Sequence, residues 1–162
     1  MAPGTEGGFT KLYPEGKVMS VFEAVLEYKK RGTDLVVIAG KEYGTGSSRD
    51  WAAKGTKLLG IKVVIAESFE RIHRSNLIGM GILPLQFLND MNRSNLKLIG
   101  SELISIINID KGFNPGAELE IEIKYENAII KKIKTLCRID TQNELEYYKN
   151  GGILQYVLRN MI

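Results

Sequence analysis

Apolar positions at helical spacing open the first part of the chain and give way to a short continuous apolar run. Ser20 and Glu23 have the separation of a capping box, and the stretch VFEAVLEYKKRG that follows carries apolar residues three and four positions apart until Gly32. This spacing predicts a helix. The next run, Leu35 to Ala39, is rich in β-branched residues, which is typical of a strand covered on both faces.

The segment after this strand repeats the two patterns in order. A glycine-rich stretch, GKEYGTGSSRD, precedes the helical stretch WAAKGTKLLG and a second apolar run, IKVVIA. ESFERIHRSNLIGMG then predicts a further helix with Ser68 as its N-cap, and ILPLQF predicts a strand in which Pro84 limits pairing. Strand, glycine-rich turn, helix and strand in this order predict a βαβ unit.

The remainder of the chain changes to strand-like patterns. LISIINI, AELEIEIKY and AIIKKIKTLCRI are strand-like runs, and the second alternates apolar with acidic residues near a Pro-Gly turn. Thr141 and Glu144 give a second capping-box signal before NELEYYKN, Gly151 and Gly152 interrupt it, and ILQYVLRNMI predicts an apolar-faced helix. We therefore expect an α/β domain with a mostly parallel central βαβ part, additional antiparallel strands and C-terminal helices.

Composition limits the class of protein. A chain of 162 residues with 44% apolar content suffices for one core, so we expect one domain over residues 9–162 and a linker or boundary segment at residues 1–8. The net charge is only +3 and no block of like charge occurs, so electrostatics nominates no partner. No apolar stretch reaches the length of a membrane span and the start does not resemble a signal peptide, so we expect a cytoplasmic protein without a membrane partner.

Two residues that often bind metals are expected to be structural. Cys137 is the only cysteine, which excludes an internal disulfide and falls short of a thiolate metal or cluster framework. We expect it to be a small apolar filler on a strand. His73 is the only histidine, and without a second ligand candidate nearby in sequence we expect it to be a packed or capped residue. No metal ligand is therefore assigned to this chain.

The segment YGTGSSRDW carries the candidate chemistry. Gly44 and Gly46 free the backbone to turn sharply, and Ser47, Ser48 and Arg49 arrive at the start of a helix. Unpaired N–H groups at a helix N-terminus, two hydroxyls and a planar guanidinium suit a carboxylate or phosphate. The nucleotide fingerprints GxGxxG and GxxxxGK[ST] are absent from the sequence. Spacing alone leaves open that a serine only caps the helix and that Arg49 is only solvated.

The run VVIAGKEYGTGSSRDWAAKGTKLLGIKVVIAESFERIHRSNLIGMGILPLQF closely resembles the C-terminal, or swivelling, domain of aconitases. The likeness extends to the helix before Gly32 and to CRIDTQNELEYYKNGGILQYVLR. It implies a swivelling β/β/α domain that closes over a cleft formed with the remaining aconitase domains. It also implies a 4Fe-4S cluster held by cysteines of those other domains, and interconversion of citrate and isocitrate through cis-aconitate. Alone, the domain is expected to bind no cluster and to be inactive.

The resemblance also implies roles for three residues of the turn. Ser47 resembles the catalytic base of the family. Ser48 and Arg49 resemble residues that bind a substrate carboxylate and neighbouring oxygens. The other substrate and proton-transfer groups of the family lie outside this chain, so these residues would form only part of a site.

Other members of the wider group stay open as alternatives. The 2-methylcitrate dehydratases share much of the sequences SSRDWAAKG and FERIHR. The small subunits of isopropylmalate dehydratases are separate chains, and their motif related to SSRDW usually reads SSREH. Iron-regulatory proteins bind RNA, and a basic rim formed by Arg71 and Arg74 with Lys54 and Lys57 would attract either RNA or a tricarboxylate. The same four residues would otherwise be an ordinary solvated face.

Overall fold

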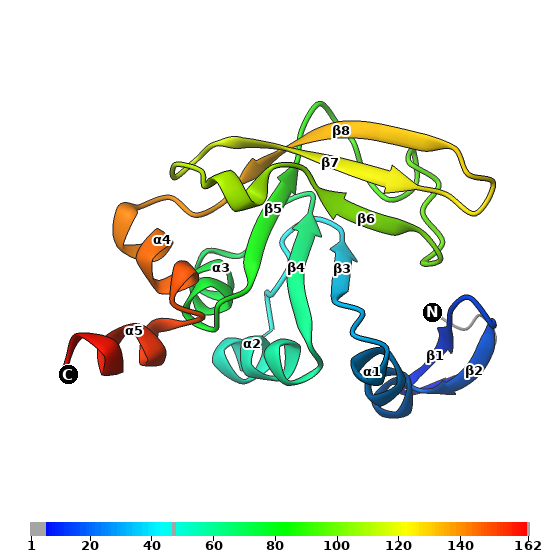
Figure 1. Ribbon diagram of the computed structural model, residues 1–162, viewed down its shortest axis with the longest axis horizontal. Coiled ribbons are helices and arrows are strands. Elements are labelled where there is room, and N and C mark those ends of the chain that lie inside the picture. The colour runs from blue at the N-terminus through cyan, green and yellow to red at the C-terminus, as the bar shows by residue number, and fades with distance from the viewer. Residues whose placement is uncertain (1–5, 47, 162) are drawn as a thin grey trace.

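The computed structural model describes residues 6–46 and 48–161 and shows an α/β domain built on one large sheet. Along the chain the elements are β1 (Phe9–Leu12), β2 (Lys17–Ser20), α1 (Val21–Lys30), β3 (Leu35–Ala39), α2 (Arg49–Leu58), β4 (Ile61–Ala66), α3 (Arg71–Gly79), β5 (Leu83–Phe87), β6 (Leu103–Ile106), the 3-10 turn η1 (Ile109–Lys111), β7 (Glu118–Lys124), β8 (Ile130–Cys137), α4 (Gln142–Lys149) and α5 (Ile153–Asn160). The described strands form a six-stranded sheet in the order β3-β4-β5-β8-β7-β6 and a separate hairpin, β1-β2 (Figure 1). The predicted fold class is confirmed.

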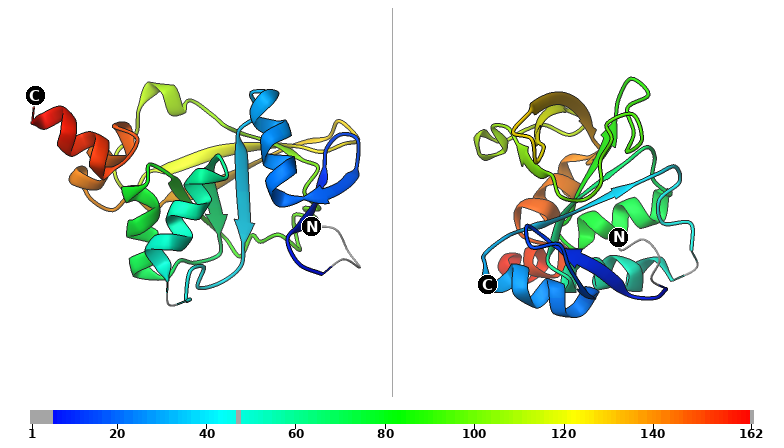
Figure 2. Two further views of the ribbon diagram at one scale, coloured as in Figure 1. Left: turned by 90° about the horizontal axis from the view of Figure 1, so that it is seen from below. Right: turned by 90° about the vertical axis from the view of Figure 1, so that its right-hand side faces the viewer.

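The parallel half of the sheet consists of β3, β4 and β5, as the βαβ pattern predicts. Helices α2 and α3 form the crossovers and pack on each other (Figure 2). β4 lies between its neighbours, and its residues Val64, Ile65 and Ala66 are fully buried. β3 is an edge strand and its residues are half-buried, but both of its faces are covered, as predicted: Val36 and Ile38 pack against one apolar cluster of the core, and Leu35 and Val37 pack against another. Its residues are not fully buried because, within the described residues, only β4 pairs with this strand.

The antiparallel half continues the same sheet. β5 is parallel to β4 and antiparallel to β8, and its register with β8 begins at Leu85, one residue after Pro84, which has no N–H to donate to a ladder. β8 then pairs with β7, and β7 with β6. The alternation along β7 buries Leu119, Ile121 and Ile123, whereas its glutamates form ion pairs with lysines of β8.

The N-terminal elements lie beside the sheet. Ser20 is the N-cap of α1 as predicted, and both hydrogen bonds of its capping box with Glu23 are present. β1 and β2 pair as an antiparallel hairpin that the sequence patterns did not predict, and the hairpin packs on α1 (Figure 1).

The C-terminal helices lie at the other side of the domain, beside α3. Thr141 caps α4 by accepting a hydrogen bond from the backbone N–H of Glu144. The carboxylate of Glu144 bonds elsewhere, so only half of the predicted capping box forms. α5 is the predicted apolar-faced helix, but its apolar side chains, Leu154 and Leu158 among them, remain exposed.

Two apolar clusters make up the core. The larger one lies along the sheet and contains Cys137, which is fully buried on β8 as predicted. The smaller one lies under α2 and α3 and is formed by Ala53, Leu77 and their neighbours on β4. This second cluster fixes both crossover helices, whose N-termini carry the candidate site. Among the described residues, no helix is both long and apolar enough to cross a membrane.

Candidate active site

The glycine-rich turn between β3 and α2 depends on Gly44. Its φ of +97° is unfavourable for residues with a side chain. A Cβ at this position would lie 2.2 Å from Cγ of His73, so the backbone can approach this ring only because residue 44 is glycine. Gly46 is different, because a Cβ there would meet nothing within 4 Å and its φ is not positive. The predicted sharp turn is therefore produced at Gly44.

The turn is fastened to the segment that precedes α3. The backbone of Tyr43 donates to Ser68 O at 2.9 Å and accepts from Glu70 N at 3.0 Å, which extends the parallel pairing of β3 and β4 beyond the strands. The Ser68 hydroxyl accepts from the backbone N–H of Glu42 at 2.7 Å. The prediction that Ser68 is the N-cap of α3 is therefore wrong. The N-cap is Glu70, whose side chain accepts a hydrogen bond from the backbone N–H of His73. Serine is the better N-cap residue in general, but this hydroxyl bonds to the neighbouring loop.

Arg49 is the first residue of α2 and lies beside this junction. Its Nε donates to Gly46 O at 3.2 Å and lies 3.4 Å from Oε2 of Glu70. The side chain is 29% exposed. Among the described residues, neither Nη group has a hydrogen-bond partner. The fork of the guanidinium thus stays available for a ligand with two oxygens, such as a carboxylate.

Ser48 of the turn keeps its hydroxyl free of the helix. Ser48 occupies the N-cap position of α2 but makes no side-chain capping hydrogen bond, and it is exposed. Its hydroxyl is therefore not used by the helix, contrary to the reading of Ser48 as a cap alone. Ser47 lies outside the described residues, so its role stays a prediction.

His73 supports the turn from beneath. It is 1% exposed, and its ring packs edge-on against the ring of Tyr43 with centroids 5.2 Å apart. Its Nδ1 lies 3.1 Å from the backbone oxygen of Arg49. Because a carbonyl oxygen can only accept, Nδ1 carries the proton in this contact. The predicted structural role of His73 is confirmed.

These residues surround an open hollow of about 400 Å³ at the N-terminus of α2, lined by Tyr43, Gly44, Gly46, Ser48, Arg49, Ala52 and His73. A larger hollow of about 700 Å³ lies between the β1-β2 hairpin and α1, and none of the candidate residues lines it. We assign the candidate site to the smaller hollow because the guanidinium, a free hydroxyl and the N–H groups of α2 converge there.

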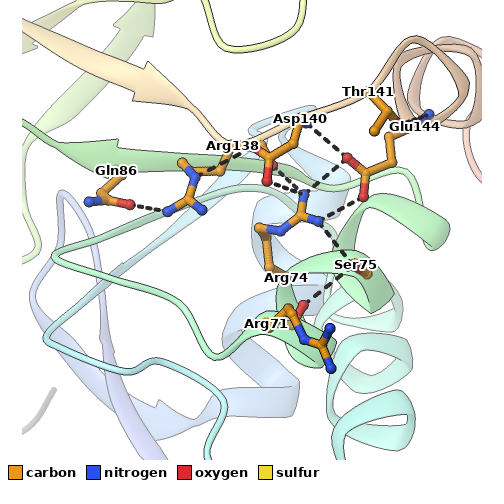
Figure 3. A network of polar contacts seen from close by, with 8 residues as sticks. All are labelled: Arg71, Arg74, Ser75, Gln86, Arg138, Asp140, Thr141 and Glu144. Carbon is orange, nitrogen blue, oxygen red and sulfur yellow. Dashed lines mark hydrogen bonds and ion pairs between the residues drawn. The ribbon is translucent and has the colours of Figure 1, made fainter.

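The predicted basic rim does not form as a unit. Arg74 is buried and binds both carboxylate oxygens of Glu144 at 2.8 and 3.0 Å, across the gap between α3 and α4 (Figure 3). Lys57 reaches Gly151 O at 3.5 Å, and burial lowers its pKa. Lys54 lies over the ring of Trp51. Arg74 therefore belongs neither to a basic rim nor to a solvated face, because its partner Glu144 is 70 positions away in sequence.

The described residues do not fit an iron–sulfur cluster. Among residues 6–46 and 48–161 there is no group of three His, Cys, Asp or Glu side chains arranged to hold a metal ion. Cys137 is buried, and burial raises the pKa of its thiol, which disfavours the thiolate form that clusters require.

Fold and site together define an α/β domain with a candidate anion site at the N-terminus of a crossover helix. The family model described as the Aconitase C-terminal domain matches residues 1–90, and the chain belongs to this family. The predicted family is confirmed.

Curated relatives match the whole chain. Aconitate hydratase A of Legionella pneumophila is 65% identical over 161 residues, which are 99% of this chain and 18% of that protein. Aconitate hydratase A of Pseudomonas aeruginosa and that of Escherichia coli are 56% and 55% identical over 162 residues, which are 100% of this chain and 18% of each relative. The chain thus spans only a small part of the relatives that it matches.

A solved structure supports the fold independently. The 3-isopropylmalate dehydratase of Methanocaldococcus jannaschii is 26% identical, with a TM-score of 0.55 over 88% of this chain and 80% of that chain. The likeness agrees with the predicted kinship to other hydro-lyases.

Sequence patterns missed Tyr43 and Glu70 as parts of the site. Both come close to the turn only because two loops pair that are 26 positions apart in sequence, as the contact between Glu42 and Ser68 shows. The only available signal was the position of Glu70 three residues before His73, which is the spacing of an N-cap and N3.

Proposed function

We propose that this chain is the C-terminal domain of an aconitate hydratase that interconverts citrate and isocitrate through cis-aconitate. The observation that carries the proposal is identity of 65% to an aconitate hydratase A along 99% of the chain. The anion site at the N-terminus of α2 supports it, because the substrates are tricarboxylates.

Within this proposal, Arg49 binds a substrate carboxylate through its Nη groups. The contacts of Nε with Gly46 O and Glu70 fix the guanidinium and support this role. Ser48 adds its hydroxyl and the backbone N–H groups of α2 add their dipoles. Ser47 is the proton-abstracting base, and its alkoxide would be stabilised by the same N-terminus with Arg49 close in sequence.

The remaining domains of the enzyme are the partner of this chain. Trp51 and Ile72 lie in the first turns of α2 and α3, next in sequence to the hollow-lining residues Ala52 and His73, and are 68% and 44% exposed. Exposed apolar side chains next to a site support a surface that closes on another domain. We place the 4Fe-4S cluster in those domains, where it would supply Lewis-acid chemistry. The limits 9–162 for this domain and 1–8 for a linker stay part of the proposal.

The related hydro-lyase alternatives differ in substrate. The likeness to 3-isopropylmalate dehydratase supports the wider group, whereas the curated relatives cited above are aconitate hydratases. Initial rates of the complete enzyme with citrate, 2-methylcitrate and 3-isopropylmalate separate these activities.

The test of the proposal is Arg49→Lys in the complete, cluster-loaded enzyme. A point charge lacks the planar fork, so KM for citrate should rise about tenfold or more. Arg71→Lys is the matched control, because Arg71 is likewise the first residue of a crossover helix but is exposed. An unchanged KM in folded, cluster-loaded Arg49→Lys would contradict the proposal.

A further inference from the structure

One carboxylate joins the N-termini of the two crossover helices. Oε2 of Glu70 accepts a hydrogen bond from His73 N at 2.8 Å, which caps α3. The same oxygen lies 3.4 Å from Nε of Arg49, at the start of α2. Glu70 therefore belongs to α3 by sequence and to the candidate site by contact.

The contact is made at Nε of Arg49, and among the described residues both Nη groups stay without a hydrogen-bond partner. Arg49 directs Nε toward Gly46 O and Glu70, and these two oxygens lie on one edge of the planar group. A guanidinium held by Nε can rotate little about its last side-chain bonds, so its Nη groups keep one direction. Side chains of both partners are mostly buried, with exposed fractions of 29% for Arg49 and 20% for Glu70, which limits alternative conformers.

His73 contacts both Glu70 and Arg49. Its backbone N–H binds Glu70, and its ring Nδ1 lies 3.1 Å from the backbone oxygen of Arg49. The ring is buried against Gly44 and Tyr43 and cannot move without displacing the turn. Arg49 is thus held at its side chain by Glu70 and at its backbone by His73.

We propose that Glu70 is a positioning residue of the enzyme, which acts through Arg49 by fixing the guanidinium fork toward the substrate carboxylate. This inference rests on the proposed function of Arg49. Glu70 does not line the hollow at the N-terminus of α2, so its loss should weaken substrate binding through Arg49 and leave the chemical step nearly intact.

Electrostatics alone predicts the opposite change in KM when Glu70 loses its charge. Glu70 carries a negative charge, because hydrogen bonds from the backbone N–H groups of His73 and Ile72, and to a smaller extent the charge of Arg49, lower its pKa. Removal of a negative charge near an anion site would by itself strengthen the binding of a tricarboxylate. A rise in KM therefore indicates positioning, and a fall in KM indicates that Glu70 only tunes the local charge.

The experiment compares Glu70→Gln with Thr141→Ala in the complete, cluster-loaded enzyme. Glutamine keeps an oxygen that can accept from His73 N but loses the charge that holds Arg49. Thr141 caps α4 in the same way and lies away from the turn, so Thr141→Ala reports the loss of a helix cap alone. Cluster content and thermal unfolding identify folded variants.

For Glu70→Gln we expect KM for citrate to rise about tenfold with kcat within about twofold, and KM of Thr141→Ala to stay unchanged. The double variant Arg49→Lys/Glu70→Gln should lose little beyond Arg49→Lys, because both changes disable one fork. An unchanged or lowered KM in Glu70→Gln overturns this inference when Arg49→Lys still raises KM. If Arg49→Lys is also silent, the proposed function itself fails.

Discussion

Removal of the buried Arg74 side chain should destabilise the domain strongly. Arg74 on α3 is 8% exposed and forms a bidentate ion pair with Glu144 of α4. Its Nη1 also donates to Arg138 O at 2.6 Å and lies 3.5 Å from Asp140 (Figure 3). Arg138 in turn bonds to Gln86 on β5. This network connects α3, β5 of the sheet and α4.

The expected magnitude follows from what Arg74→Ala leaves behind. Breaking a buried ion pair by removal of one partner costs about 3–5 kcal/mol. Glu144 would keep the hydrogen bond from Asp140 N at 2.8 Å and its side chain is 16% exposed, which favours the lower end of that range. We therefore expect a loss of about 3 kcal/mol in the free energy of unfolding, and a fall in Tm of roughly 6–12 °C.

Urea unfolding of the chain, followed by circular dichroism, measures this loss. The sequence patterns predict that the chain unfolds cooperatively by itself, which the wild-type curve tests first. Lys134→Ala is the control, because Lys134 pairs with Glu118 at 3.0 Å on the exposed face of β7 and β8 and should contribute about 0–1 kcal/mol.

A double-mutant cycle with Glu144→Ala isolates the pair. The two changes should be coupled by more than about 1 kcal/mol, since each removes the same contact. A loss below about 1 kcal/mol for Arg74→Ala, or additive effects in the cycle, would refute the view that this ion pair stabilises the packing of α3 and α4.

Two further perturbations probe the same region. Gly44→Ala should lower the free energy of unfolding by about 3 kcal/mol, because an alanine there has an unfavourable φ and clashes with His73. Gly46→Ala should change it by less than about 1 kcal/mol, because a Cβ there meets no neighbouring atom. Urea unfolding of both variants measures the difference, and equal losses would contradict this expectation. Acid should weaken the domain through Glu144: burial opposes its ionisation, but hydrogen bonds from Arg74 and Asp140 N outweigh this, so its pKa lies below the ordinary value. The unfolded chain then binds the proton more tightly, so this contribution is present above the ordinary pKa of Glu and is lost as pH falls through the folded pKa. Stability curves of Glu144→Gln should lack this component, and curves parallel to wild type would contradict the assignment.

Local patterns predicted most of the fold because the deciding signals lie close together in sequence. The Ser20–Glu23 capping box, the apolar run of β4 and the alternation along β7 each depend on neighbours within a few residues. The hairpin β1-β2 was missed because no clear alternation marks its two short strands.

The errors concern residues whose partners are far away. Arg74 was interpreted either as part of a basic rim or as part of a solvated face, but Glu144, 70 positions later, forms a buried ion pair with it. Ser68 was interpreted as a helix cap, but Glu42, 26 positions earlier, binds its hydroxyl. Charge and capping preference identify what a side chain can bind, whereas tertiary packing decides which partner is present.

The candidate site was predicted in part. The sequence located Ser48 and Arg49 at a helix N-terminus, where the structure has them. It did not predict that Glu70 and His73 hold Arg49, because this requires α3 to begin beside α2.

The most direct test of the central claim is the turnover number of Ser47→Ala in the complete enzyme loaded with its cluster. If Ser47 abstracts the proton, kcat for isocitrate should fall by about a hundredfold or more, since general-base catalysis contributes about 10²–10⁴-fold. KM should stay within about twofold, because Arg49 still binds the substrate carboxylate. Near-normal turnover of a folded, cluster-loaded Ser47→Ala enzyme would contradict the account and leave the serine with only a role in the turn.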